Sequence, residues 1–528
     1  MAELERRTIG AGTVTYEGLH DAVRTCLRDA AVGDIVEKLL ATPAVPVDTT
    51  TEDSGQQLCH FCGRQIPLLE RLLLGACTCQ LAVKFVSTRT GDIVSIAGWC
   101  AVTLLLVLHS PRCELLPLYA SLGLIVLRSV LLPSTTTATA SFWSLHPVFD
   151  TLGAVSVALA WASSLLFPWP ELSQLHGPYQ TIGCRSMRLG GIECRVFYPS
   201  TDNPQSDTKK RSTNQNLVPY LHHGRHLMKG LGVFSKMPAW LFHNMSNAHL
   251  AAFQDVPVAS PPAASDGWPL VIFSHGLAGS LELYSYVNQQ LASHGYVVVV
   301  PNHCDGSACV CSPEPGRIEY YQQITAEVRD DIDGAGFRFR NGQLQQRVSE
   351  VRAVLDAIKQ NATADSVFRR CDLTNVSVAG HSFGAATALT AAHQDARFKK
   401  MVLLDAWMEP LDHDVRDGLG PRVPALHLMS EHFLHWRPNA ESTERHARGC
   451  THARSRLTWL RGTRHNNFSD IPVFSPAVNR LLKSAGNIDH FYALQAIGQL
   501  SAAFLAGDFD ARAAEFPELS TVTSATCK

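Results

Sequence analysis

The chain has 528 residues, of which 46% are hydrophobic, and its formal net charge is −2. This length exceeds one compact core of ordinary size, so we expect more than one domain. Because basic and acidic residues nearly balance, there is no electrostatic case for a nucleic-acid partner.

Residues 1–67 are polar and mixed, with one helix expected around Gly18–Leu40 and a role that stays open. Residues 68–170 form a hydrophobic block with apolar runs at Ile93–His109, Leu115–Leu132 and Val148–Trp169. Each run approaches the roughly 20 residues that a bilayer core requires. We therefore predict a multi-pass membrane protein, the alternative being buried helices of a soluble domain.

The number of spans depends on a fourth, weaker run, Leu68–Val86, which Arg71 and Lys84 interrupt. Three or four spans are expected, and the choice reverses the side on which the C-terminal part lies.

The 15 cysteines do not form a zinc framework, because Cys59 and Cys62 are followed by the closer pair Cys77 and Cys79. We expect no metal and no cofactor.

Residues 171–528 have the pattern of a soluble α/β domain. Ile182–Leu189 and Ile192–Tyr198 flank Gly190-Gly191 and predict a β-hairpin. Further along, short apolar runs alternate with stretches of helical periodicity, which predicts a mostly parallel sheet covered by helices on both faces. The expected strands are Pro269–Ser274, Tyr296–Val300, Val376–Ala379, Met401–Leu404 and Leu457–Leu460, and the expected helices include Leu283–His294 and Gln343–Lys359.

A serine between two glycines, in Gly380-His381-Ser382-Phe383-Gly384, follows one of these strands and precedes an alanine-rich helix. In an α/β-hydrolase fold the nucleophile occupies such a strand-to-helix turn. We predict this fold and assign Ser382 as the nucleophile.

A serine nucleophile needs a base that is oriented by a carboxylate. Asp405 follows the strand Met401–Leu404 and is the expected acid, whereas Asp412 and Asp414 fall in a polar loop. A strand-end aspartate that merely caps a turn is the alternative for Asp405.

The expected base is His465, in the loop that follows the strand Leu457–Leu460. This position, just after the last strand of the sheet, favours it over the competitors His446, His452 and His490. The sequons at Asn375 and Asn467 fall on a buried strand and beside this histidine, where a glycan would not fit, which leans toward a cytosolic catalytic domain.

Two backbone N–H groups are needed to stabilise the oxyanion. We expect them from Phe383, the residue after the nucleophile, and from Leu277, in the loop His275-Gly276-Leu277-Ala278-Gly279. Trp407 and Met408, directly after the acid, are candidates for the acyl pocket, although they could equally belong to the core.

These residues together resemble the platelet-activating-factor acetylhydrolase family, the group VII phospholipases A2, from about Gly177 to near Phe516. The resemblance rests on FSHGLAGS, LASHGYVVVVPNHCDGSA, GHSFGAAT, LLDAWMEPL and RGTRHNNFSD. It implies an α/β-hydrolase that cleaves a short or oxidised sn-2 acyl chain from a phospholipid without calcium, using Ser382, Asp405 and His465.

The chain departs from the better-known members of this family in two places. They lack its hydrophobic N-terminal block, so we expect a membrane-anchored branch. Animal members also tend to have an arginine where this chain has Cys304, in His303-Cys304-Asp305. The resemblance further implies that a helix in His222–Phe253 docks on a lipid surface at which the phospholipid substrate lies; a lid or a packed helix is the alternative.

Two other functions stay open at this point. One is another carboxylester hydrolase or lipase that acts on neutral or small esters. The other is a membrane scaffold with a vestigial hydrolase domain. The oligomeric state is not indicated.

Overall fold

The structure is a computed structural model that describes residues 72–78, 115–120, 146–166, 170, 172, 174–201, 217–418 and 423–522. The helix expected at Gly18–Leu40 and the run Ile93–His109 lie outside these residues. The division into segments 1–67, 68–170 and 171–528 stays a prediction.

A single sheet of eleven strands dominates the described part of the chain, in the order β13-β12-β11-β10-β9-β5-β6-β2-β1-β4-β3. Its six central strands, from β12 to β6, are parallel, and β13 and β2 join them antiparallel at either side. A separate pair, β7 and β8, is antiparallel. The strands are β1 Ile182–Leu189, β2 Ile192–Pro199, β3 Leu217–Pro219, β4 His249–Gln254, β5 Trp268–Ser274, β6 Val297–Pro301, β7 Val310–Cys311, β8 Glu319–Tyr320, β9 Cys371–His381, β10 Phe398–Leu404, β11 Ala425–Ser430, β12 Arg456–Leu460 and β13 Leu519–Thr521.

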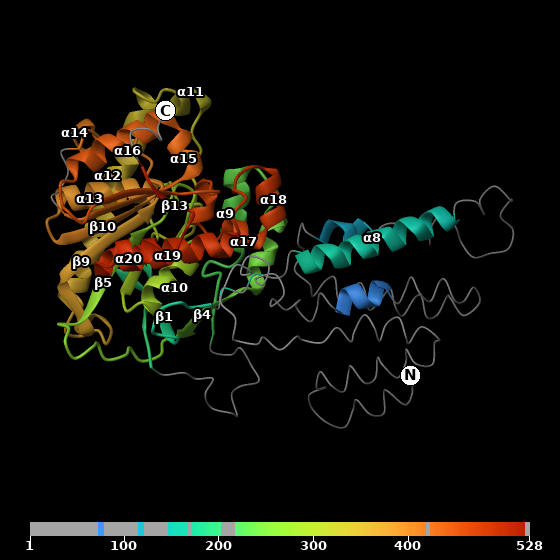
Figure 1. Ribbon diagram of the computed structural model, residues 1–528, viewed down its shortest axis with the longest axis horizontal. Helices are drawn as coiled ribbons and strands as arrows, with labels where there is room; N and C mark the ends of the chain where they lie inside the picture. Colours follow the sequence, from blue (N-terminus) through green and yellow to red (C-terminus); the bar gives the residue numbers. More distant parts are fainter. Residues whose placement is uncertain are drawn as a thin grey trace.

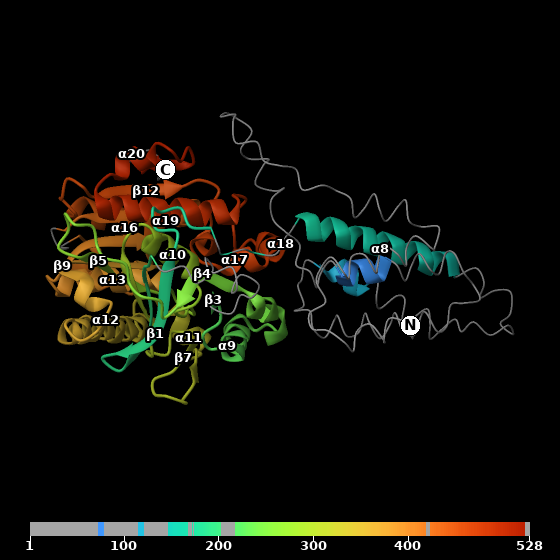
Figure 2. The ribbon, with the colours of Figure 1, turned by 90° about the horizontal axis from the view of Figure 1, so that it is seen from below.

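Helices cover both faces of the sheet. The α-helices are α8 His146–Leu166, α9 Arg225–Ser235, α10 Ser285–Ser293, α11 Ala326–Asp330, α12 Ala335–Asn361, α13 Phe383–Gln394, α14 His413–Arg416, α15 Glu431–His435, α16 Arg437–Gly449, α17 Ile471–Phe474, α18 Pro476–Leu481, α19 His490–Ala506 and α20 Phe509–Ala513, and the 3₁₀ helices are η3 Ala239–Asn247, η4 Phe368–Arg370 and η5 His465–Phe468. Figure 2 shows α12 and α13 on one side of the strands and α19 and α20 on the other.

The alternation of side chains along β6 explains the two layers. Val298 and Val300 pack into the core beneath α10 and α19, whereas Val297 and Val299 pack into the core beneath α12 and α13. A strand buried on both faces needs apolar residues at every position, and β6 has them. The predicted three-layer arrangement with a mostly parallel sheet is confirmed, and so is the hairpin of β1 and β2.

The prediction of a multi-pass membrane protein is wrong for the part of the chain that the structure describes. None of the helices there is both long enough and apolar enough to span a bilayer. The run Val148–Trp169 forms α8, in which Thr151, Ser156 and Ser163 interrupt the apolar residues. Val157 and Ala160 of α8 pack instead on Leu74 and Leu118 of the short helices at 72–78 and 115–120, and Figure 1 shows this group beside the sheet domain.

Candidate active site

Ser382 is the single residue between the end of β9 and the start of α13 (Figure 1). Its backbone has φ 58° and ψ −118°, a conformation that costs a non-glycine residue energy and that the flanking packing must hold in place. The two glycines of the motif allow this close packing. A Cβ on Gly380 would lie 2.2 Å from the carbonyl oxygen of Gly384, and one on Gly384 would lie 2.0 Å from that of Ser274.

The three candidate triad residues form one chain of hydrogen bonds. His465 Nε2 lies 2.9 Å from Ser382 Oγ, and His465 Nδ1 lies 2.7 Å from Asp405 Oδ2. Ser382 and Asp405 follow the adjacent strands β9 and β10, and His465 follows β12, which β11 separates from β10. All three strands are parallel, so the carboxyl edge of the sheet brings the three residues together.

The carboxylate of Asp405 is fully buried and is held by Ser430 as well as by His465. The backbone N–H of Ser430 donates to Oδ1 at 2.7 Å, and the Ser430 hydroxyl donates to Oδ2 at the same distance. Hydrogen bonds to an ionised carboxylate are strong and fix its direction. The arrangement therefore sets the plane and the tautomer of His465.

Two rings sandwich the imidazole of His465. Phe433 stacks on it with centroids 4.2 Å apart, and His381 lies at 4.4 Å on a tilted plane. Burial, and then the proximity of His465, hold the pKa of His381 well below its ordinary value, so His381 stays neutral. A neutral neighbour allows His465 to gain a proton without facing a second full charge.

The competing residues have other partners. Asp412 accepts hydrogen bonds from Asn341 and Gln345 of α12, and Asp414 is exposed. His490 is buried beside Asn467. These positions leave Asp405 as the acid that contacts His465.

Leu277 and Phe383, the expected oxyanion donors, lie on two segments that meet at the nucleophile. A Cβ on Gly276 would be 3.3 Å from Ser382 Cβ, so the loop before Leu277 borders the serine directly. Ala278 has φ 53°, which turns this loop sharply. Within the described part of the chain, no backbone acceptor takes the N–H of Leu277 or Phe383.

A buried arginine braces this loop from α12, which sequence reasoning missed. Arg347 Nη1 donates to the carbonyl oxygen of His275 at 2.6 Å, and its Nε lies 3.1 Å from Asp305 Oδ2. Its guanidinium carbon lies 4.5 Å from the centre of the Phe383 ring. Arg347 thus contacts both oxyanion segments, and Asp305 of the His303-Cys304-Asp305 stretch neutralises it.

The helical periodicity of α12 contained a signal for Arg347. Leu344, Val348 and Val351 mark the buried stripe of this helix, and Arg347 lies on the same stripe. A charged residue at a core-facing position indicates a buried partner. The partner itself, Asp305, is too distant in sequence to be recognised.

The hydroxyl of Tyr284 holds the same loop from the other side. It accepts the N–H of Gly276 at 3.1 Å and lies 3.0 Å from His381 Nδ1. The Tyr284 hydroxyl and His381 Nδ1 therefore share one hydrogen bond. One hydroxyl therefore connects the oxyanion loop with the residue before the nucleophile.

A cavity of about 440 Å³ opens beside the oxyanion loop. Leu277 and Trp407 line it, and Trp407 N–H donates to the carbonyl oxygen of Ser382 at 3.2 Å, which places the cavity next to the nucleophile. Met408 is buried in the hydrophobic core and does not line it. The remaining lining residues include Phe234, Lys236, Tyr321, Arg329, Phe337, Arg340 and Glu409.

Comparison with known proteins identifies the family. The model of the family described as platelet-activating factor acetylhydrolase, isoform II, matches residues 167–518, about two thirds of the chain, so the chain belongs to this family. A platelet-activating factor acetylhydrolase of Cavia porcellus is 27% identical over 349 residues, covering 62% of this chain and 76% of that protein. A putative phospholipase A2 of Schizosaccharomyces pombe is 25% identical over 389 residues, with coverages of 62% and 85%.

The fold is shared more widely. A ferulic acid esterase from Streptomyces cinnamoneus superposes with a TM-score of 0.50 and 19% identity, over 67% of this chain and all of that one. The α/β-hydrolase fold is thus confirmed, and family membership makes the chain an esterase.

Proposed function

We propose that this family member is a calcium-independent serine esterase that hydrolyses a short or oxidised sn-2 acyl ester of phospholipids. The observation that carries the proposal is the continuous chain from Ser382 through His465 to the buried Asp405, with the serine in a left-handed backbone conformation. This is the arrangement that activates a serine hydroxyl.

In the proposed mechanism His465 Nε2 takes the proton of Ser382 as Oγ attacks the ester carbonyl. Asp405 stabilises the imidazolium that forms. The lysophospholipid leaves with the proton that His465 returns, and water activated by His465 then hydrolyses the acyl-enzyme. The N–H groups of Leu277 and Phe383 stabilise the two oxyanions, each by about 3–4 kcal/mol.

The charges of the cavity support a phospholipid over a neutral ester. Lys236, Arg329 and Arg340 line it against one acid, Glu409, and Asp330 pairs with Arg329 at 2.8 Å; the remaining positive charge favours an anion such as the phosphodiester. Aromatic side chains at the same wall, among them Tyr321 and Trp407, suit a quaternary ammonium headgroup.

Exposed apolar side chains near the cavity support docking on a lipid surface. His222–Phe253, expected to contain one docking helix, folds as α9, η3 and β4. Val233, Phe234 and Trp240 of α9 and η3 are exposed, and Phe234 also lines the cavity. Insertion of these side chains into a lipid interface would bring the cavity mouth to the substrate.

The test is hydrolysis of phosphatidylcholines that differ only in sn-2 chain length, with a calcium chelator present. Acetyl and short oxidised chains should be cleaved and long chains spared. Ser382→Ala should lower kcat by about 10⁶-fold, because the remaining groups cannot form an acyl-enzyme. Ser377→Ala, at a buried serine of the preceding strand, is the matched control.

Preference for neutral or small esters would refute the phospholipid substrate and leave the triad in place. Substantial turnover by Ser382→Ala would refute the nucleophile. Absence of labelling by a fluorophosphonate probe would instead favour a vestigial domain.

A further inference from the structure

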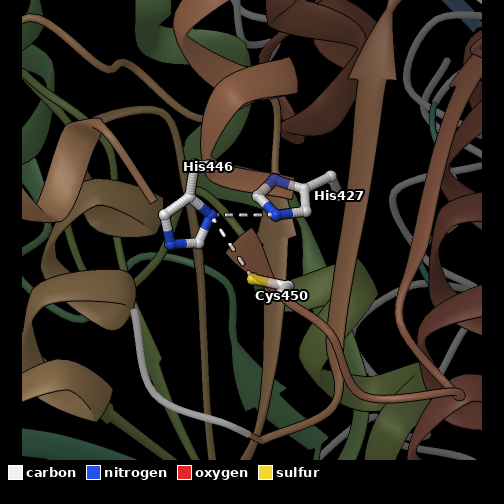
Figure 3. Close-up of side chains that lie close together, drawn as sticks. All are labelled: His427, His446 and Cys450. Carbon is white, nitrogen blue, oxygen red and sulfur yellow. Dashed lines mark hydrogen bonds between the residues drawn. The ribbon is translucent and has the colours of Figure 1, made fainter. Parts of the chain in front are cut away.

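A second cluster of side chains consists of two histidines and a cysteine and includes none of the triad residues. His427 comes from β11, His446 from α16, and Cys450 directly follows α16. All three are buried. Figure 3 shows the two imidazoles and the thiol directed toward one another.

The three inner atoms have the spacing of zinc ligands. His446 Nδ1 lies 3.2 Å from His427 Nε2 and 3.7 Å from Cys450 Sγ, and one ligand atom from each residue falls within 4.8 Å of the others. Tetrahedral Zn²⁺ with its usual bond lengths separates two nitrogens by roughly 3.4 Å, and nitrogen and sulfur by roughly 3.6 Å. Two of the three distances between ligand atoms thus match those of tetrahedral zinc.

Hydrogen bonding within the protein satisfies only the inner side of this cluster. The hydrogen bond between His446 Nδ1 and His427 Nε2 occupies two of the four imidazole nitrogens, and Cys450 Sγ lies within hydrogen-bond distance of the first of them. Among the described residues, His427 Nδ1 and His446 Nε2 are buried and have no hydrogen-bond partner.

A neighbouring cavity gives access to the cluster. It has a volume of about 320 Å³ and is lined by His427 and Cys450 together with Glu444. Glu444 Oε1 is also buried and has no hydrogen-bond partner in the described part of the chain. Its other oxygen, Oε2, accepts a hydrogen bond from Arg448 at 2.9 Å, so Glu444 is already paired and water is the available fourth ligand.

We propose that His427, His446 and Cys450 bind one Zn²⁺ ion, with water from the neighbouring cavity as the fourth ligand. Zinc binding releases the Cys450 thiol proton to solvent and forms the Zn–S bond. Two imidazoles and one thiolate are borderline-soft ligands that favour Zn²⁺ over Mg²⁺ or Ca²⁺.

Such an ion would link α16 to β11, and both elements hold the segment that carries the triad acid. Asn439 of α16 accepts the N–H of Met408 at 2.8 Å and donates to the carbonyl oxygen of Ala406 at 2.9 Å. β11 ends at Ser430, which holds Asp405. The site is therefore structural: it stabilises the two elements that position the acid and takes no part in the ester chemistry.

The test uses the full chain, stripped with a chelator and then titrated with ZnCl₂ or CoCl₂. One zinc per chain should remain after desalting, the melting temperature should rise with zinc concentration, and Co²⁺ should give the absorption bands of a tetrahedral cobalt thiolate. Cys450→Ser should abolish the thiolate band and weaken zinc binding more than about tenfold. Cys371→Ser, at a half-buried cysteine at the start of β9, should leave both unchanged.

Retained zinc, the melting temperature and the cobalt spectrum do not depend on esterase activity. They therefore test the zinc site even if the proposed function is wrong. If Cys450→Ser does not fold, His427→Leu decides, since it removes one ligand and one unpartnered buried nitrogen together. No retained zinc in the wild type would overturn the proposal, and so would a cobalt spectrum that neither variant changes.

Discussion

The two sides of the nucleophile are held by different forces. On the triad side, Asp405 and His465 follow strands of the parallel sheet and are linked by charge-assisted hydrogen bonds. On the oxyanion side, the loop around Leu277 contains no ionisable catalytic group, and Arg347 and Tyr284 hold it by its backbone atoms.

This difference shows which residues can be recognised in advance. Chemistry on the triad side requires particular side chains, whereas the oxyanion side requires only backbone N–H groups in the right place. Positioning of the loop is consequently left to side chains from elsewhere in the fold. Asp470 links the two sides, since its carboxylate accepts the N–H of Tyr286 at 3.3 Å and its own N–H donates to Leu283 at 2.8 Å.

The largest effect should come from the triad side. Asp405→Asn replaces the carboxylate by an amide that cannot hold His465 in the tautomer that accepts the serine proton. We expect kcat to fall by about 10⁴-fold, measured on an sn-2 acetyl phospholipid. Asp414→Asn, at an exposed acid of the short helix α14, should retain full activity, and equal losses in both variants would contradict the assignment of the acid.

On the oxyanion side, Arg347→Met should reduce stability as well as activity. The change leaves Asp305 buried without its partner, so the free energy of unfolding should fall by about 3–5 kcal/mol in denaturant titration. Arg352→Met, on the same helix but with an exposed side chain, should fall within about 0.5 kcal/mol of the wild type.

A double variant separates the charge of Arg347 from its contact with the loop. Arg347→Met with Asp305→Leu should recover much of the stability, because no unpaired charge remains. Its kcat should stay low, because the His275 carbonyl oxygen still lacks its donor. Recovery of both quantities would show that Arg347 has no positioning role.

The stability of the protein should depend on pH through Asp470, the residue that links the two sides. Burial raises the pKa of Asp470 from its ordinary value of 3.8 to about 7. The folded state therefore holds a proton that the unfolded state loses, and stability should decrease by up to about 4 kcal/mol as the pH rises from 4 to 7. Urea titrations at several pH values measure this dependence, and in Asp470→Asn the free energy of unfolding should change less with pH. If it changes as in the wild type, other groups cause the dependence.

The smallest effect should come from Tyr284→Phe, which removes one hydroxyl from the oxyanion loop. Loss of its hydrogen bond to Gly276 is expected to lower kcat by about five- to tenfold, at nearly constant KM. Tyr296→Phe removes a buried hydroxyl that donates to Ala502, far from the loop, and should affect stability alone. A matching change in kcat for both variants would mean that Tyr284 acts only through stability.

The sequence alone predicted five of the six parallel strands and the three candidate triad residues that follow strands, whereas β11 (Ala425–Ser430) was not predicted. Runs such as the four valines of β6 can be buried only in a two-sided sheet, and Ser382, Asp405 and His465 each follow a strand at the same edge. Local pattern also placed α12, because its apolar stripe repeats every three to four residues.

Only the tertiary structure decided which distant residues meet. Arg347 and Asp305 are 42 residues apart, and His427 and His446 belong to a strand and a helix that are brought together only by packing. The hydrophobic block illustrates the same limit, since an apolar run is compatible with a bilayer span or with packing on other helices, as α8 packs here. Periodicity reports which face of an element is buried, whereas its partner depends on contacts between segments that the local pattern does not encode.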